Sequence, residues 1–184
     1  MSRIPTPVNI ADAPAAAQPL LEAVKRQLGV TPNLYKITSN SPAALEGLLG
    51  LTGALGKGAL EGRTRERLAL AVAEANGCGY CLAAHSYLGK NLAKLDDAEL
   101  IANRRGGSSD AKANAALHFA VRVVEARGHV SEEDIADVKA AGYSDAQIIE
   151  IVAHVALNTL TNYLNEAFKT EIDFPIAAPL TKAA

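Results

Sequence analysis

The chain has 184 residues, of which 49% are hydrophobic and 21% are charged, and its formal net charge is -2 at pH 7. This length favours one domain, the hydrophobic content excludes disorder throughout, and the lack of a basic block argues against nucleic-acid binding. No apolar run reaches the ~20 residues that a membrane-spanning helix needs, and the N-terminus lacks an apolar signal segment. We therefore expect a cytoplasmic protein that does not enter a membrane.

Helical periodicity dominates the sequence. Alanine makes up roughly a fifth of the residues, which favours helix, and no long segment alternates apolar and polar residues as a strand would. We therefore expect one all-α domain over residues 1–184, with an extended N-terminal arm at 1–16 and an extended C-terminal tail at 174–184. Neither arm has an obvious core to join in its own chain, so their apolar residues predict contact with a neighbouring subunit.

The first half of the chain predicts five helices. Three are expected at 18–28, at 34–38 and from Pro42 to a glycine-rich run at 50–58. Thr64 is a candidate cap for a fourth helix, which runs to about Asn76 and is ended by Gly77. A fifth helix at about 79–92 would fold back along the fourth. Residues 63–92 are therefore expected to form a helical hairpin.

Each of the last four expected helices follows a side chain that can accept hydrogen bonds from the amides of a first turn. These are Asp96 before a helix to residue 104, Asp110 before one to 127, Ser131 before one that Gly142 ends, and Ser144 before the last helix, at about 145–169.

The hairpin carries a thiol pair with two ionisable partners. Cys78 and Cys81 are the chain's two cysteines, His85 follows Cys81 by four residues, and Glu66 precedes Cys78 by twelve. The i and i+4 spacing places Cys81 and His85 on one helix face. If the chain reverses at Gly77, Glu66 also comes close to His85. The sequence therefore predicts a dithiol redox site.

The expected chemistry requires an ionised thiol, because the thiolate attacks peroxides and disulfides. The unpaired amides at the start of the fifth helix can stabilise a thiolate there, and His85 can accept or pass on a proton. Glu66 can orient the imidazole as the third group of a proton relay. Cys78 would then condense with a sulfenic acid on Cys81 to give a disulfide.

Each of these residues also has a simpler interpretation. Two cysteines in an apolar helical segment can be small buried hydrophobes, and Glu66 can be a favourable charge in a first helical turn. A metal held by Cys78, Cys81 and His85 is a third interpretation, but zinc sites normally bring a second pair of ligands. We therefore expect neither a metal nor an organic cofactor.

A Glu, eleven residues, Cys-x-x-Cys, three residues and a His make a more specific pattern than two cysteines alone. Over 63–89 this pattern resembles the alkylhydroperoxidase D / carboxymuconolactone decarboxylase family, and the longer chain resembles its peroxidase-related branch. The resemblance implies an all-helical fold and a trimer or hexamer. It also implies hydroperoxide reduction with Cys81 as nucleophile, Cys78 as resolving thiol, and Glu66 and His85 as proton relay, with an external dithiol as reductant.

Tyr80 lies where characterised peroxidases of this family often carry a histidine. A phenol, with a pKa near ~10, cannot shuttle protons at neutral pH, but it can donate a hydrogen bond to a thiolate or a peroxide oxygen. Two other functions remain open. One is decarboxylase or lactone chemistry that uses Glu66 and His85 without the thiols, and the other is a non-enzymatic redox sensor or scaffold.

A second polar feature lies on the last expected helix. Glu150, His154, Asn158 and Asn162 recur at steps of four on an otherwise apolar helix, with Asn165 nearby. Such a stripe either faces solvent or forms a polar line toward the thiols or a neighbouring subunit. The sequence does not separate these two interpretations.

Overall fold

The computed structural model describes residues 1–180, which form helices and connecting segments with no strand among them. Two short 3-10 helices, η1 (Ile10–Asp12) and η2 (Ala15–Ala17), precede the α-helices. The α-helices are α1 (Gln18–Leu28), α2 (Asn33–Thr38), α3 (Pro42–Leu55), α4 (Gly62–Ala75), α5 (Gly79–Asn91), α6 (Asp97–Arg104), α7 (Ala111–Glu125), α8 (Glu132–Ala140) and α9 (Asp145–Phe168). The all-α prediction is confirmed.

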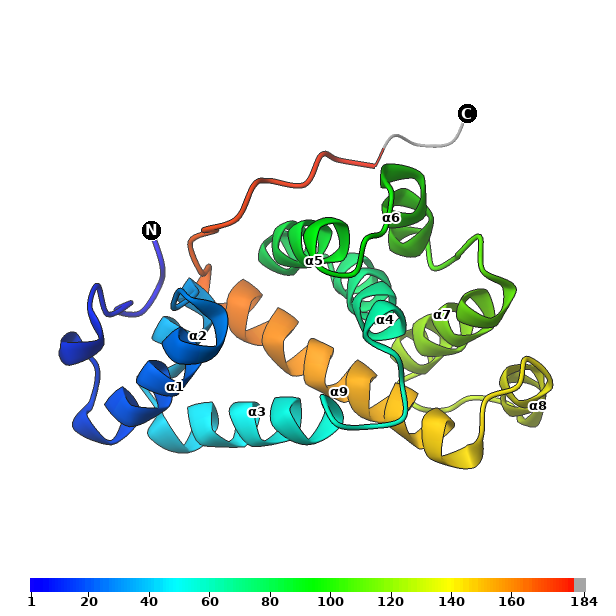
Figure 1. Ribbon diagram of the computed structural model, residues 1–184, viewed down its shortest axis with the longest axis horizontal. Coiled ribbons are helices and arrows are strands. Elements are labelled where there is room, and N and C mark those ends of the chain that lie inside the picture. The colour runs from blue at the N-terminus through cyan, green and yellow to red at the C-terminus, as the bar shows by residue number, and fades with distance from the viewer. Residues whose placement is uncertain (181–184) are drawn as a thin grey trace.

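Helix α4 lies at the centre of the molecule, where it packs against α5, α6, α7 and α9 (Figure 1). Its residues 67–73 are all buried, because a helix contacted on several sides must be apolar around most of its circumference. The main core joins α4 to α7 and α9 through side chains such as Leu68, Leu117 and Ile151. This packing fixes the position of α9 relative to the α4–α5 hairpin.

Most predicted helix boundaries agree with the structure to within about two residues, the usual scatter between assignments. Asp96, Asp110, Ser131 and Ser144 all accept hydrogen bonds from the first turns of α6, α7, α8 and α9. The prediction for Thr64 is wrong. Helix α4 begins at Gly62 with Glu61 as its N-cap, and Thr64 is buried inside the helix.

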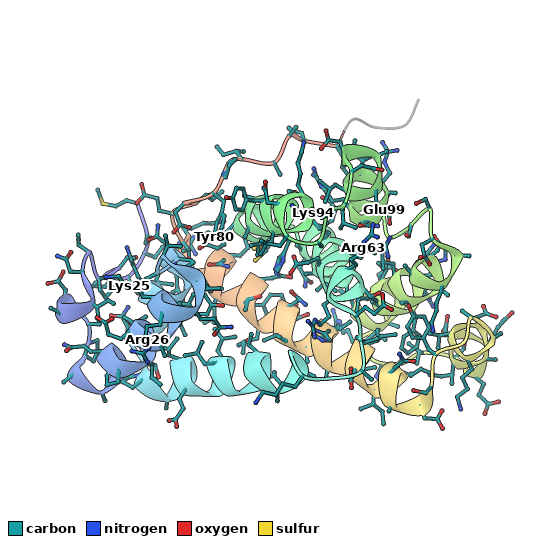
Figure 2. All side chains as sticks on the ribbon, in the orientation of Figure 1. Lys25, Arg26, Arg63, Tyr80, Lys94 and Glu99 are labelled. Carbon is teal, nitrogen blue, oxygen red and sulfur yellow. The ribbon has the colours of Figure 1, made fainter. Side chains whose placement is uncertain are left out.

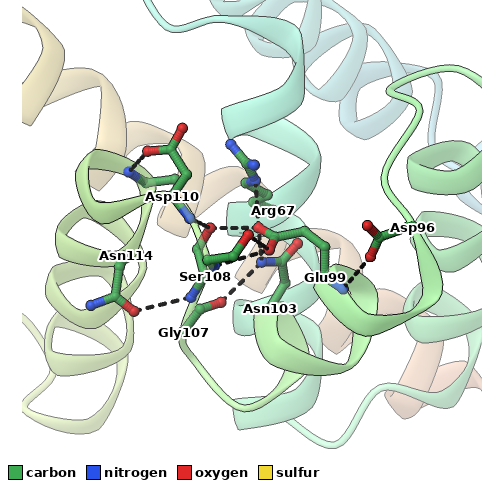
Figure 3. A network of polar contacts seen from close by, with 10 residues as sticks. Arg67, Asp96, Glu99, Asn103, Gly107, Ser108, Asp110 and Asn114 are labelled. Atoms are coloured by element: carbon green, nitrogen blue, oxygen red, sulfur yellow. Dashed lines mark hydrogen bonds and ion pairs between the residues drawn. The ribbon is translucent and has the colours of Figure 1, made fainter.

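A buried ion pair and its hydrogen bonds join α4, α6 and the loop before α7 (Figure 3). Arg67 Nε lies 2.9 Å from Glu99 Oε1, and both side chains are buried. Ser109 donates two hydrogen bonds to Glu99 Oε2, from its amide and its hydroxyl, and Ser108 and Asn103 donate to Oε1. Burial alone would raise the pKa of Glu99, but these donors lower it to about 2.

The N-terminal arm packs on its own chain. Ile10 and Ala13 join Ala17, Leu21 and Leu45 in a small apolar cluster beside α1 and α3. The expectation that the arm has no core of its own to join is therefore wrong. Short polyalanine turns bury small side chains without helical periodicity, and so leave no sequence signal.

The C-terminal tail runs from the end of α9 across α5 toward α6 (Figure 1). Residues 171–180 lack regular secondary structure, as predicted, and 181–184 lie outside the described residues. The ring of Phe174 contacts Tyr80 edge-on, with centroids 5.8 Å apart. Arg104 Nη1 donates to the carbonyl of Ala178 at 2.7 Å. The tail therefore also packs on its own chain, contrary to expectation.

No helix among residues 1–180 is long and apolar enough to cross a membrane.

Candidate functional site

Cys78 lies at the junction of α4 and α5. Gly77 adopts φ +67°, a conformation that glycine reaches at little cost, and this residue ends α4. The amide of Gly77 donates to Glu74 O at 3.1 Å, and the amide of Cys78 donates to Ala73 O at 2.9 Å. These two bonds form a Schellman motif, which reverses the chain. Cys78 then serves as the N-cap of α5.

The two sulfur atoms lie next to each other. Both cysteines are free thiols; Cys78 is 0% exposed and Cys81 is 3% exposed. The amide of Cys81 donates to Cys78 Sγ at 3.2 Å, which is an N-cap interaction made by sulfur. The amide that opens α5 therefore binds Cys78 rather than Cys81. The expected contact between a first-turn amide of this helix and a cysteine sulfur is therefore made at Cys78.

Side chains instead favour ionisation of Cys81. The Cys78 thiol donates a hydrogen bond to the Cys81 sulfur, and this lowers the pKa of Cys81 most. Burial opposes the shift, but the charge of His85 and the amides of Asn165 and Asn162 help to bring that pKa to about 6. The pKa of Cys78 is raised, since its proton is held by Cys81 and the residue is buried. Of the two sulfurs, Cys81 is the one whose ionisation these surroundings favour.

Glu66 and His85 meet across the hairpin. His85 Nδ1 lies 2.9 Å from Glu66 Oε2, as the predicted chain reversal requires. Burial alone would lower the pKa of His85, but the Glu66 charge, their hydrogen bond and the Cys81 sulfur raise it. The two side chains are 23% and 24% exposed, far more than either cysteine. Glu66 and His85 are therefore the more solvent-exposed side of the site.

Helix α9 completes the surroundings of Cys81. Asn165 Nδ2 donates to Cys81 Sγ at 3.3 Å, and Asn162 Oδ1 accepts from Asn76 Nδ2 at 2.9 Å. Asn158 and His154 continue the same stripe and are also buried. The stripe therefore faces inward, toward the thiols at its C-terminal end. The spacing of Asn158 and Asn162 in the sequence indicated a polar face on this helix. It could not predict that Asn165 contacts Cys81.

Tyr80 does not reach the thiols with its hydroxyl group. The phenol donates to Asp173 Oδ1 at 2.7 Å and accepts from the Leu34 amide at 3.2 Å. Figure 2 labels Tyr80 near the start of α5, on the side of α2. Burial raises the pKa of this phenol. Its expected hydrogen bond to a thiolate or a peroxide is therefore replaced by a bond that anchors the C-terminal tail.

Metal ligands do not gather at this site. Within residues 1–180, no group of three His, Cys, Asp or Glu side chains is arranged to hold a metal ion. Glu74 is closer to Cys78 in sequence than Glu66 is, but its Oε2 lies 2.7 Å from Arg104 Nε. Glu66 is thus the carboxylate that contacts the imidazole.

Comparison with known proteins gives a family match over part of the chain. The sequence pattern that defines the carboxymuconolactone decarboxylase family matches residues 42–126, the segment from α3 to the end of α7. Over this segment, which is less than half of the chain, the sequence is similar to that family. No curated protein sequence gives a significant match. The matched segment holds Glu66, Cys78, Cys81 and His85, whereas Asn162 and Asn165 lie beyond it.

Solved structures share this fold. An uncharacterized peroxidase-related protein from Ralstonia eutropha JMP134, described as an alkylhydroperoxidase AhpD core, has a TM-score of 0.83 and 24% identity, covering 94% of this chain and 92% of that one. An uncharacterized peroxidase-related protein from Silicibacter sp. TM1040 has a TM-score of 0.80 and 25% identity, with 92% and 91% covered. The debrominase Bmp8, solved as a cysteine-to-alanine variant with 2,3,4-tribromopyrrole, has a TM-score of 0.76 and 22% identity, with 94% of both chains covered. The same fold therefore occurs in a debrominase and in uncharacterized peroxidase-related proteins.

Proposed function

We propose that this protein is a thiol-dependent peroxidase or disulfide reductase, with Cys81 as nucleophile and Cys78 as resolving thiol. The observation that carries the proposal is the asymmetry of the two sulfurs. Cys81 has a pKa of about 6 while Cys78 is held protonated beside it. A thiolate near neutral pH next to a second thiol is what disulfide-forming catalysis needs.

The first step is oxidation of Cys81. Its thiolate attacks the terminal oxygen of a hydroperoxide, an S–O bond forms, and the O–O bond breaks. Cys81 becomes a sulfenic acid and the peroxide is reduced to an alkoxide. The imidazolium of His85, one helical turn from Cys81, gives its proton to the alkoxide, which leaves as an alcohol. Glu66 favours that imidazolium through the 2.9 Å hydrogen bond.

The second step closes the disulfide. Neutral His85 accepts the proton of Cys78, and the Cys78 sulfur attacks the Cys81 sulfur. Hydroxide leaves and takes up a proton to become water. An external dithiol then reduces the disulfide by thiol–disulfide exchange, so that two thiols are restored and the donor is oxidised. Such a donor is available in a reducing cytoplasm, where we propose that the protein works.

Self-association is part of the same proposal. Helix α9 carries an apolar face that includes Ile149 at 70%, Leu160 at 43% and Tyr163 at 61% exposure. Exposed apolar faces of this kind favour protein–protein contact. They support the trimer or hexamer that the family resemblance implies, which size-exclusion chromatography with light scattering would measure.

Peroxide consumption in the presence of a dithiol tests the proposal. The wild type should turn over hydroperoxide and lose two titratable thiols when oxidised without reductant, whereas Cys81→Ser should lose turnover. Full turnover by Cys81→Ser would reject the proposal. A decarboxylase that uses only Glu66 and His85 would keep its activity after thiol alkylation. A redox sensor would react slowly with peroxide but change its assembly on oxidation.

A further inference from the structure

Two buried amide groups beside Cys81 have hydrogen-bonding atoms left over. Asn165 uses Nδ2 for Cys81 Sγ, and its Oδ1 has no partner within residues 1–180. Asn162 uses Oδ1 for Asn76, and its Nδ2 completes no hydrogen bond with any described residue. Both asparagines are buried. One acceptor therefore has no partner next to the Cys81 sulfur, and one donor is directed at that sulfur without completing a hydrogen bond.

Buried polar atoms in folded proteins almost always have a partner, so an unused pair at a reactive atom needs an explanation. Each amide is fixed by its other atom. The bond to Cys81 Sγ determines which end of Asn165 is free, and the bond from Asn76 does the same for Asn162. The Asn162 side chain lowers the pKa of Cys81 by hydrogen bonding, so its Nδ2 is directed at that sulfur. The free acceptor and donor are therefore held ready for a group bound at Cys81.

The terminal oxygen of a hydroperoxide matches this pair, because it carries one hydrogen to donate and lone pairs that accept. After attack by Cys81, the same O–H group belongs to the sulfenic acid. We propose that Asn162 and Asn165 form an oxygen subsite, in which Asn165 Oδ1 accepts from the O–H group and Asn162 Nδ2 donates to its oxygen. This inference rests on the proposed peroxidase function.

The subsite also defines a substrate class. It binds only the terminal O–H group, so hydrogen peroxide and organic hydroperoxides fit, while dialkyl peroxides and disulfides offer no hydrogen to Asn165. The remainder of an organic hydroperoxide would extend toward Glu66 and His85, the more exposed side of the site. Hydroperoxides should therefore benefit from the asparagines, whereas an electrophile without an O–H group should not.

The test compares two electrophiles on the same sulfur. In a Cys78→Ser background, which stops the cycle after one oxidation, Cys81 is treated with tert-butyl hydroperoxide and, separately, with iodoacetamide. Both rate constants are taken at a pH where Cys81 is fully ionised. The rate constant for the hydroperoxide is divided by that for iodoacetamide. This ratio removes any effect of a substitution on the pKa of Cys81. Asn162→Leu and Asn165→Leu should each lower that ratio about tenfold to a hundredfold, somewhat below the loss of an oxyanion-hole donor.

Asn158→Leu is the matched control. Asn158 lies on the same stripe and is buried, but its amide donates to His154 O one turn from the site. It should leave the ratio unchanged. If a leucine variant does not fold, Asn162→Asp, which has the same size and lacks the donor, gives the second measurement. An unchanged ratio in the Asn162 and Asn165 variants overturns the oxygen subsite. A wild-type protein that iodoacetamide labels but hydroperoxide does not oxidise overturns the peroxidase function itself.

Discussion

Asn165 donates a hydrogen bond to the sulfur of Cys81 across 84 positions of sequence. The donor comes from the last turn of α9 and the acceptor from the first turn of α5. The thiol site is therefore not contained in the hairpin that carries the cysteines. The packing of α9 on α4 and α5 supplies part of the surroundings of the Cys81 sulfur.

The first prediction concerns the pH dependence of thiol alkylation. The pKa of Cys81 is about 6, below that of an ordinary cysteine near ~8.5. Its reaction with iodoacetamide should therefore accelerate as pH rises through about 6 and level off above. Cys78→Ala removes the donor that lowers this pKa most, so the midpoint should move to higher pH. Stopped-flow labelling measures both curves. A Cys81→Ser protein should lack the fast phase, which is the alkylation of the Cys81 thiolate.

Glu66 should control the protonation of His85. Glu66→Gln keeps the size of the side chain and removes the charge that raises the pKa of His85. That pKa should fall, which NMR titration of the imidazole would detect. Peroxide turnover near neutral pH should fall about tenfold or more, because the imidazolium serves as general acid. Glu74→Gln, on the same helix but beside Arg104, is the matched control and should alter neither quantity.

Acid should destabilise the fold through Glu99. Its pKa is lowered from the ordinary 4.5 to about 2 in the folded chain. This carboxylate therefore stabilises the fold fully above about pH 4.5, and the contribution of up to ~3 kcal/mol is lost as pH falls through about 2. Urea unfolding across this range would show the loss, and Glu99→Gln should flatten it. The exposed Glu46→Gln variant on α3 should follow the wild-type curve.

The Tyr80 hydroxyl should hold the tail in place. Tyr80→Phe keeps the contact with Phe174 but breaks the hydrogen bonds to Asp173 and from Leu34. We expect a loss of ~1–2 kcal/mol in the free energy of unfolding, since one partner is a carboxylate, and faster alkylation of Cys78. Tyr87→Phe, whose ring also contacts Phe174 but is half exposed, should change neither measurement. Unchanged labelling of Cys78 in Tyr80→Phe would contradict this role of the tail.

Local signals in the sequence predicted most of the helices, because caps and glycine stops act within a few residues. Ser144 with Gln147 and Gly77 are examples, and each has the expected geometry. The prediction that Thr64 is an N-cap was wrong, because threonine suits both an N-cap and a buried position within a helix. The arm and the tail were also misread, because Ala13 and Phe174 pack on partners that no local pattern reveals.

The residues of the candidate site also fall into a part that local signals predict and a part that they do not. Glu66, Cys78, Cys81 and His85 lie on one hairpin, so a single chain reversal was enough to bring Glu66 and His85 together. The hydroxyl of Tyr80 and the amide of Asn165 depend on how α9 and the tail pack against α5. Long-range packing of this kind leaves only a weak mark in one sequence, here the recurring asparagines.

The cover over Cys78 has a kinetic consequence. This thiol has no exposed surface, and Phe174 packs in the apolar cluster around it. Under the proposed function, an external dithiol would reach a disulfide at Cys78 only after residues 171–180 move away from α5. The hydrogen bond from Tyr80 to Asp173 would then set how long the disulfide form persists.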